Sequence, residues 1–197
     1  MRFHAMGQRL LIVALALALA ACGGAQMNKA DQEPVIKQGE SMVVFLRSTF
    51  VGSAISASVF DVSGPDSKFI GVVNNGTKVG YPLAPGKYTF MVVSESADFM
   101  QATVLPGKTY YAMVTPRIGM WKARFSFRPV RQSELAGSEF GGWNSGTQFV
   151  VNSPDTLNWA SSNAADIASK RNQYWSEWSA KPEPERAAQT LNAEDGR

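Results

Sequence analysis

The fold of this chain follows from residues 84–93, which read APGKYTFMVV. Proline and glycine favour a tight turn, and the residues after the lysine favour an extended strand. Residues 105–114, LPGKTYYAMV, repeat the arrangement. Because two copies are too few for a repeat protein, we interpret them as one kind of turn used twice in a β-domain.

Short β-forming runs separated by turn residues fill residues 41–131. The other predicted strands are 42–47, 55–60, 69–73, 77–81, 99–105 and 121–130. Asn75 and Gly76 lie between two of these strands, and an Asn-Gly pair between apolar runs is the strongest short signal for a β-hairpin. About eight strands with no helical period between them predict a mainly β domain. We expect an antiparallel β-sandwich of about seven to eight strands or a partly open barrel, followed by a C-terminal amphipathic α-helix.

Residues 132–152 form a connection rich in glycine and serine, and its aromatic side chains indicate that it lies against the domain. A helix is predicted over residues 153–181. Ser153 can cap its start, Pro154 suits its first turn, and Pro182 ends it.

One stripe of this predicted helix is apolar, at about 100° per residue. It contains Leu157, Ala160, Ala164, Ile167, Ala168, Tyr174, Trp175 and Trp178. We expect the stripe to pack on the sandwich; a groove or a surface for a partner helix is the alternative. Arg171 lies within the stripe, where a cation–π contact with Trp175 and Trp178 would accommodate it. Residues 182–197 are expected to form a short helical turn and a loose tail.

The start of the chain is similar to a bacterial lipoprotein signal. Its apolar run, residues 10–21, is too short to span a bilayer and follows a basic start. Leu19, Ala20, Ala21 and Cys22 resemble a lipobox, which implies a signal peptide over residues 1–21 and a diacylglyceryl group on Cys22. A cleaved, soluble periplasmic protein with a chance cysteine is the alternative. Gly23, in place of an aspartate, favours the outer membrane, facing the periplasm. Residues 22–40 are small and polar, which predicts a flexible tether.

Composition narrows the possible chemistry. Removing residues 1–21 takes away Arg2 and Arg9, so the 19 basic residues fall to 17 against 16 acidic residues, a poor balance for nucleic-acid binding. The only histidine, His4, leaves with the signal, and the only cysteine is Cys22. We therefore predict no catalytic residue, no metal site and no cofactor; converging carboxylates are the remaining route to hydrolysis.

Several turn and core motifs resemble an uncharacterised family of bacterial lipoprotein domains, domain of unknown function 2846. The motifs are VG at 79–80, PGKY at 85–88, PGKTYY at 106–111, VTPR at 114–117 and WKARF at 121–125. The resemblance covers roughly residues 42–130 and leaves out the C-terminal helix. It implies a β-domain and brings no catalytic residues.

A basic stripe on the last predicted strand is the first candidate binding surface. It consists of Lys122, Arg124 and Arg128, with Arg117 and Arg131 nearby. These side chains could contact an anion, a lipid headgroup or a glycan phosphate. The alternative is a solvated outer face of an edge strand, where charges prevent unwanted pairing.

Tryptophans form the second candidate surface. Trp143, Trp159, Trp175 and Trp178 could line a groove for a glycan or a peptide, and packing within the protein is the alternative. The sequence thus predicts a lipid-anchored, non-enzymatic envelope protein that binds or scaffolds another protein in the periplasm. A module that binds a small ligand, a glycan or an anionic headgroup is the alternative.

Overall fold

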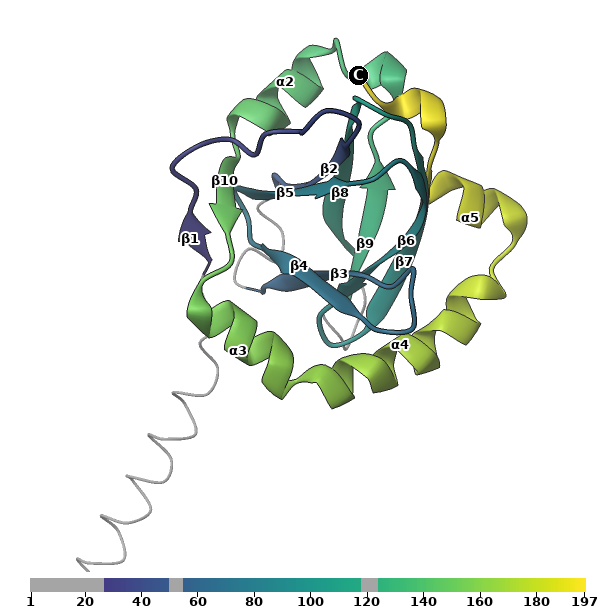
Figure 1. Cartoon of the computed structure of the whole chain (residues 1–197). Coiled ribbons are helices and arrows are strands. Elements are labelled where there is room, and N and C mark those ends of the chain that lie inside the picture. The colour runs from purple at the N-terminus through teal and green to yellow at the C-terminus, as the bar shows by residue number, and fades with distance from the viewer. Residues whose placement is uncertain (1–26, 50–54, 118–123) are drawn as a thin grey trace, which may run out of the picture.

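The structure is a computed structural model that describes residues 27–49, 55–117 and 124–197. Within these residues two β-sheets pack face to face (Figure 1). Sheet one has the order β1 (Asn28–Lys29), β10 (Gln148–Val151), β5 (Thr77–Leu83), β2 (Ser41–Arg47), β8 (Thr109–Arg117), β9 (Arg124–Pro129). Sheet two has the order β11 (Thr190–Leu191), β7 (Ala97–Val104), β6 (Gly86–Val93), β3 (Ala57–Asp61), β4 (Lys68–Val73).

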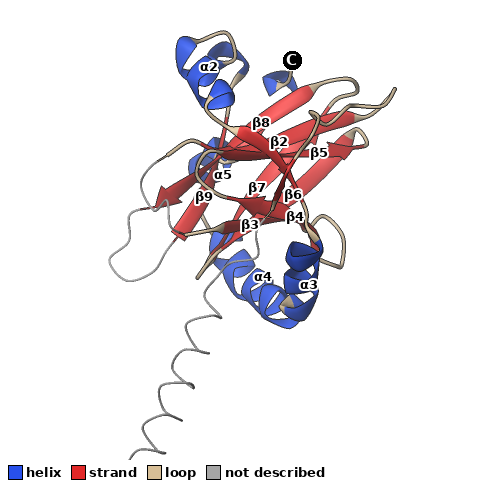
Figure 2. Cartoon of the chain, turned by 90° about the vertical axis from the view of Figure 1, so that its left-hand side faces the viewer, coloured by secondary structure: helices blue, strands red, loops and turns tan. Residues whose placement is uncertain are grey.

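Helices cover the outer faces of both sheets, so the molecule has four layers (Figure 2). The helical elements are η1 (Gln132–Glu134), α2 (Ser138–Ser145), α3 (Pro154–Ser162), α4 (Ala164–Ser179), α5 (Glu183–Ala188) and η2 (Ala193–Asp195). Phe140 of α2 packs on Met42 and Tyr111 of sheet one. On the other side, α4 packs on sheet two through Ile167 and Trp178.

The predicted β-sandwich with C-terminal helices is confirmed, but its strand pairing is mixed rather than purely antiparallel. Among the described residues, β2 pairs in parallel with β8, β10 with β5, and β11 with β7. The last two parallel pairs involve short strands from the C-terminal third of the chain: β10 lies between β1 and β5 in sheet one, and β11 is an edge strand of sheet two.

Both Pro-Gly turns perform the same task, which is to move the chain from one sheet to the other. The turn at residues 85–86 connects β5 of sheet one to β6 of sheet two, and the turn at residues 106–107 connects β7 back to β8. Gly107 has φ +73°, a backbone conformation that favours glycine. The predicted Asn75-Gly76 hairpin is wrong in this respect: Gly76 makes a tight turn with φ +77°, but β4 and β5 then separate into opposite sheets.

The core between the sheets is aromatic and aliphatic. Phe45 of β2 lies 5.0 Å from Phe90 of β6 and 5.5 Å from Phe127 of β9, measured between ring centroids. All three side chains are buried. Because the partners come from both sheets, this cluster holds the sandwich together.

The predicted helix over residues 153–181 is divided into α3 and α4. Its start is as expected, since the Ser153 hydroxyl accepts a hydrogen bond from the backbone N–H of Thr156 at 3.1 Å. The division comes at Asn163, whose side-chain amide donates to the carbonyl of Trp159 at 2.8 Å. A side-chain bond to the backbone competes with helix continuation. The division lets the two helices run in different directions beside sheet two (Figure 1).

Two segments expected to be loose belong to the fold instead. Within residues 22–40, the described part begins with Met27, whose sulfur accepts the backbone N–H of Val72 at 3.4 Å, and β1 pairs with β10. The expected flexible tether is therefore wrong from Met27 onward. The prediction of a loose tail is wrong as well, because Leu191 is fully buried in β11. The connection over residues 132–152 contains η1, α2 and β10, and it lies against the domain as expected.

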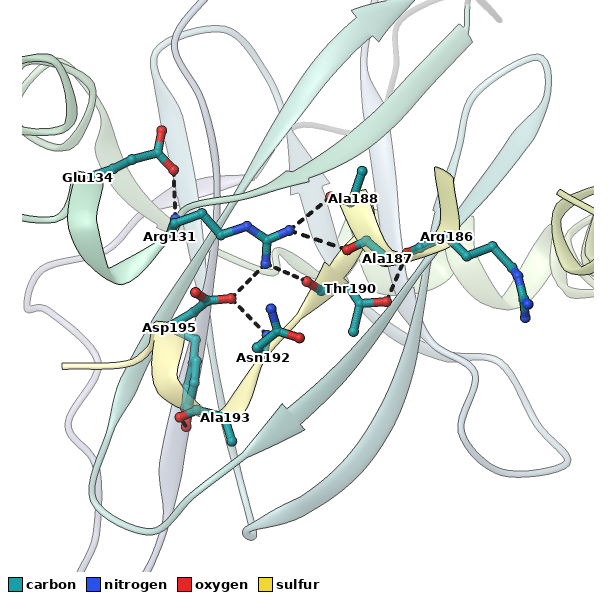
Figure 3. A network of polar contacts seen from close by, with 10 residues as sticks. Arg131, Glu134, Arg186, Ala187, Ala188, Thr190, Asn192, Ala193 and Asp195 are labelled. Carbon is teal, nitrogen blue, oxygen red and sulfur yellow. Dashed lines mark hydrogen bonds and ion pairs between the residues drawn. The ribbon is translucent and has the colours of Figure 1, made fainter. Parts of the chain in front are cut away.

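Arg131 ties the C-terminal segment to the sandwich (Figure 3). Its Nη1 donates to the carboxylate of Asp195 at 2.8 Å and to the carbonyl of Thr190 at 2.7 Å. Its Nη2 donates to the carbonyls of Ala187 and Ala188. The Asp195 residue is 3% exposed, so the carboxylate depends on this guanidinium for its counter-charge.

Replacing Arg131 by methionine should lower the free energy of unfolding by about 2–3 kcal/mol, because it leaves a buried carboxylate and several carbonyls without their donor. Denaturant unfolding measures the loss, and hydrogen exchange at Leu191 shows whether the tail opens. Arg128→Met is the matched control. Arg128 pairs with Glu134 at the surface, and such pairs contribute at most about 1 kcal/mol. Equal losses in the two variants would contradict the assigned role of Arg131.

Candidate functional site

A groove of about 910 Å³ runs between the two helices α3 and α4 and residues 62–67, which link β3 to β4. We call it the helix groove. Its walls are formed by Phe60, Val62, Ser63, Pro65, Asp66, Ser67, Phe69, Thr89, Leu157, Ala160, Ser161, Ala164, Ile167, Ala168, Arg171, Asn172 and Trp175. Its volume lies within the range of about 300–1,000 Å³ that is usual for ligand sites.

The floor of the helix groove is apolar and fixed by packing. The ring of Phe69 lies 5.3 Å from that of Phe60 and 6.1 Å from that of Trp159. Ile167 belongs to the same cluster and is buried. These side chains come from two strands of sheet two and from both helices, so the floor keeps its shape when the groove is empty.

Two large apolar side chains in the walls are open to solvent. Leu157 of α3 is 52% exposed and Trp175 of α4 is 38% exposed. The Trp175 ring stacks on Trp178, with centroids 5.3 Å apart, and meets the edge of Phe99 at 5.1 Å. Trp175 is therefore held in place while part of its ring faces the groove.

Arg171 connects the two walls of the groove. Its guanidinium donates to the carbonyls of Val62, Gly64 and Pro65, at distances of 2.7–2.9 Å. The expected cation–π contact with Trp175 and Trp178 is replaced by these three bonds. The three bonds hold the loop close to α4. Because carbonyl acceptors are neutral, they do not cancel the positive charge of the guanidinium at the groove rim.

The predicted basic stripe is not a continuous charged surface in the described residues. The Arg128 guanidinium forms an ion pair with Glu134 and lies over the ring of Trp143, 5.0 Å from its centroid. Arg117 lies 3.5 Å from a carboxylate oxygen of Asp98. Arg124 is opposite Arg117 in the β8–β9 pair and is exposed. Lys122 lies outside the described residues, as do Leu19, Ala20, Ala21 and Cys22.

Asp98 is a buried anchor that the sequence pattern did not indicate. Its carboxylate accepts a hydrogen bond from the Lys181 ammonium at 2.9 Å and another from the Gln189 amide. The same Gln189 accepts from the indole N–H of Trp178 at 3.1 Å. These contacts fix the end of α4 to β7, which is a structural role.

The predicted aromatic surface is largely internal. Trp178 is 2% exposed, and Trp159 is half-buried against Phe69. Trp143 is on α2, at the opposite side of the molecule from α3 (Figures 1 and 2). Of the four tryptophans considered, Trp175 alone lines the helix groove.

Ionisable groups buried elsewhere have internal partners. Burial lowers the pKa of Lys78, and nearby Glu33 partly offsets this shift. The Lys78 ammonium donates to the carbonyl and the side chain of Asn144 at the end of α2. Burial, together with the carboxylate of Asp61, raises the pKa of Tyr81, whose hydroxyl donates to that carboxylate. These contacts account for the groups structurally.

Comparisons with known proteins leave the chain unassigned: no protein-family model matches it, and no curated protein matches it at a significant level. The resemblance to domain of unknown function 2846 therefore stays a prediction. In the described part of the chain, no helix is long and apolar enough to cross a membrane. No group of three or more histidine, cysteine, aspartate or glutamate side chains is placed there to hold a metal ion.

Proposed function

We propose that this chain is a lipid-anchored, non-enzymatic protein of the bacterial cell envelope that binds a polypeptide segment of a partner protein in the helix groove. The observation that carries the proposal is the pair of exposed side chains, Leu157 and Trp175, above the apolar floor of a preformed groove. Lipid attachment at Cys22 and a periplasmic location are supported by the lipobox pattern of the sequence.

The composition of the groove favours a polypeptide over a purely apolar ligand. Ser67 and Asn172 line it together with its apolar residues. Hydroxyl and amide groups can hydrogen-bond to the peptide groups of an extended or helical segment, while the apolar floor takes its side chains. Arg171 and Asp66 both line the groove, so their opposite charges set no preferred sign of charge for the bound segment.

The alternative, a module for a small anionic ligand or a glycan phosphate, would use the basic stripe. Two of its arginines already face carboxylates, since Arg128 pairs with Glu134 and Arg117 with Asp98. These ion pairs weaken the positive electrostatic potential of the stripe, so it attracts an anionic ligand less strongly. The described residues therefore favour the helix groove as the binding site.

The experiment uses a photocrosslinking residue at Ser161, which lines the groove, in cells that make the full acylated protein. The adjacent Ser162 is also exposed but does not line the groove, so it serves as the position control. We expect one discrete protein adduct from position 161 and none of that size from position 162.

Ala168→Trp should reduce this adduct about tenfold, because overfilling a fitted site costs about 1–3 kcal/mol. Ala165→Trp is the matched control, since Ala165 is an exposed alanine on the same helix outside the groove. Circular dichroism checks that both variants fold. An adduct that survives Ala168→Trp unchanged would contradict binding in the groove.

A further inference from the structure

The short chain between Cys22 and the folded domain limits how the domain can sit on a membrane. Only four residues separate Cys22 from Met27, where the described structure begins. Fully extended, five residue steps span about 17 Å. A domain of this size is about 40 Å across, so the segment between Cys22 and Met27, which we call the leash, is shorter than the diameter of the folded domain.

The position of Met27 decides which face the leash reaches. Its sulfur accepts a bond from the backbone of Val72 and its methyl group lies against Gly71, both in β4. The next residue, Asn28, pairs with Val151 of β10, after which α3 begins. The attachment point therefore lies beside β4, β10 and the start of α3 (Figure 1).

This face also exposes apolar side chains. Among the described residues, Val151 is 46% exposed at the end of β10, and Leu157 is 52% exposed on α3. Exposed charged residues nearby are Lys29, Asp31, Glu33 and Asp155, so acidic groups outnumber basic ones and electrostatic attraction to anionic lipid does not contribute. Apolar side chains of this kind gain free energy when they enter the headgroup layer.

We infer that the face made of β1, the end of β10 and α3, which we call the exit face, rests on the phospholipid bilayer surface when Cys22 carries its lipid. This inference rests on the proposed lipid anchor. It also places one wall of the helix groove at the membrane, so the partner segment would bind in the groove close to the lipid headgroups. Helix α2, which lies at the other end of the molecule from α3 in both views, is farther from the membrane (Figures 1 and 2).

The test places a fluorescent label on either side of the acylated protein. Once Cys22 carries lipid, a cysteine introduced elsewhere is the free thiol. Asn158→Cys labels α3 on the exit face, and Glu139→Cys labels α2 on the opposite side; both positions are exposed. Each protein is reconstituted in phosphatidylethanolamine–phosphatidylglycerol vesicles that contain headgroup-labelled quencher lipid.

We expect quenching at position 158 to be at least about twice that at position 139, because only the exit face lies within the headgroup layer. A Gly/Ser insert of about 20 residues after Gly24 extends the mean reach of the leash to about 25 Å, and the contrast should then fall to about half or less. Equal quenching at both positions, or a contrast unaffected by the insert, would overturn the inference while leaving the anchor intact.

The failure of the anchor itself has a different signature. If the protein purified from membranes carries no lipid by mass spectrometry and does not float with the vesicles, the proposed anchor is wrong and the inference falls with it. If the protein floats with the vesicles but quenching is equal at positions 158 and 139, only the inference that the exit face rests on the bilayer is overturned.

Discussion

Replacing Cys22 by serine should abolish lipid attachment, and it should shift any protein that is still cleaved from the membrane fraction into the soluble periplasmic fraction. A serine hydroxyl cannot form the thioether that carries the diacylglyceryl group. Each buried methylene contributes about 0.8 kcal/mol, so two or three acyl chains hold a protein far more firmly than its own side chains do. Cell fractionation followed by immunoblotting measures the shift, and mass spectrometry of the amino terminus measures the lipid.

Gly23→Ser is the matched control, because it changes a neighbouring residue and keeps the thiol. That variant should stay with the membrane and keep its acylated terminus. If the protein carries no lipid with Cys22 in place, or still carries it after Cys22→Ser, the lipobox prediction is wrong. A soluble but cleaved Cys22→Ser protein is the expected product only if an ordinary signal peptidase accepts the altered site; otherwise the uncleaved precursor accumulates, and its larger mass identifies it.

The sequence predicted the strands well because their signals are local. Pro-Gly turns and β-forming runs act within about ten residues, so 84–93 and 105–114 indicate β6 and β8 without knowledge of the rest. Which sheet each strand joins depends on contacts between distant residues. The turn at Gly76 shows the limit, since the Asn-Gly pattern gave the turn and not the separation of its two strands.

The C-terminal segment was harder to predict because its order comes from tertiary contacts. Leu191 stands in a polar, alanine-rich stretch with no periodic pattern, and yet it is fully buried against sheet two. Arg131, some 60 residues earlier, supplies the donors that hold this segment (Figure 3). No spacing rule connects residues at such a distance, so the sequence alone favoured a loose tail.

The helix groove was predicted in part. The apolar stripe of the helix correctly grouped Leu157, Ile167 and Trp175, which form one wall and part of the floor. The other wall is a loop around Pro65, and its position depends on the bonds from Arg171 to three backbone carbonyls. Carbonyl acceptors exist at every residue, so the sequence carries no signal for this contact.

The largest stability loss is expected from Trp178→Ala, at about 3–5 kcal/mol. The side chain is 2% exposed, stacks on Trp175 and lies 6.1 Å from Phe99 between ring centroids. Its removal leaves a large cavity and takes the indole donor from Gln189. Denaturant unfolding followed by far-ultraviolet circular dichroism measures the loss without relying on tryptophan fluorescence.

Two further variants separate packing from binding. Trp178→Phe keeps the ring and loses the hydrogen bond, so it should cost less than the alanine variant, about 1–3 kcal/mol. Leu157→Ala, at a half-exposed position in the groove wall, should cost less than about 1 kcal/mol and should weaken the Ser161 adduct. If Trp178→Ala leaves stability unchanged, the side chain is not the internal anchor of α4 that its contacts describe. If Leu157→Ala unfolds the protein, the exposed wall is part of the core, and the groove loses the side chain on which its proposed binding role depends.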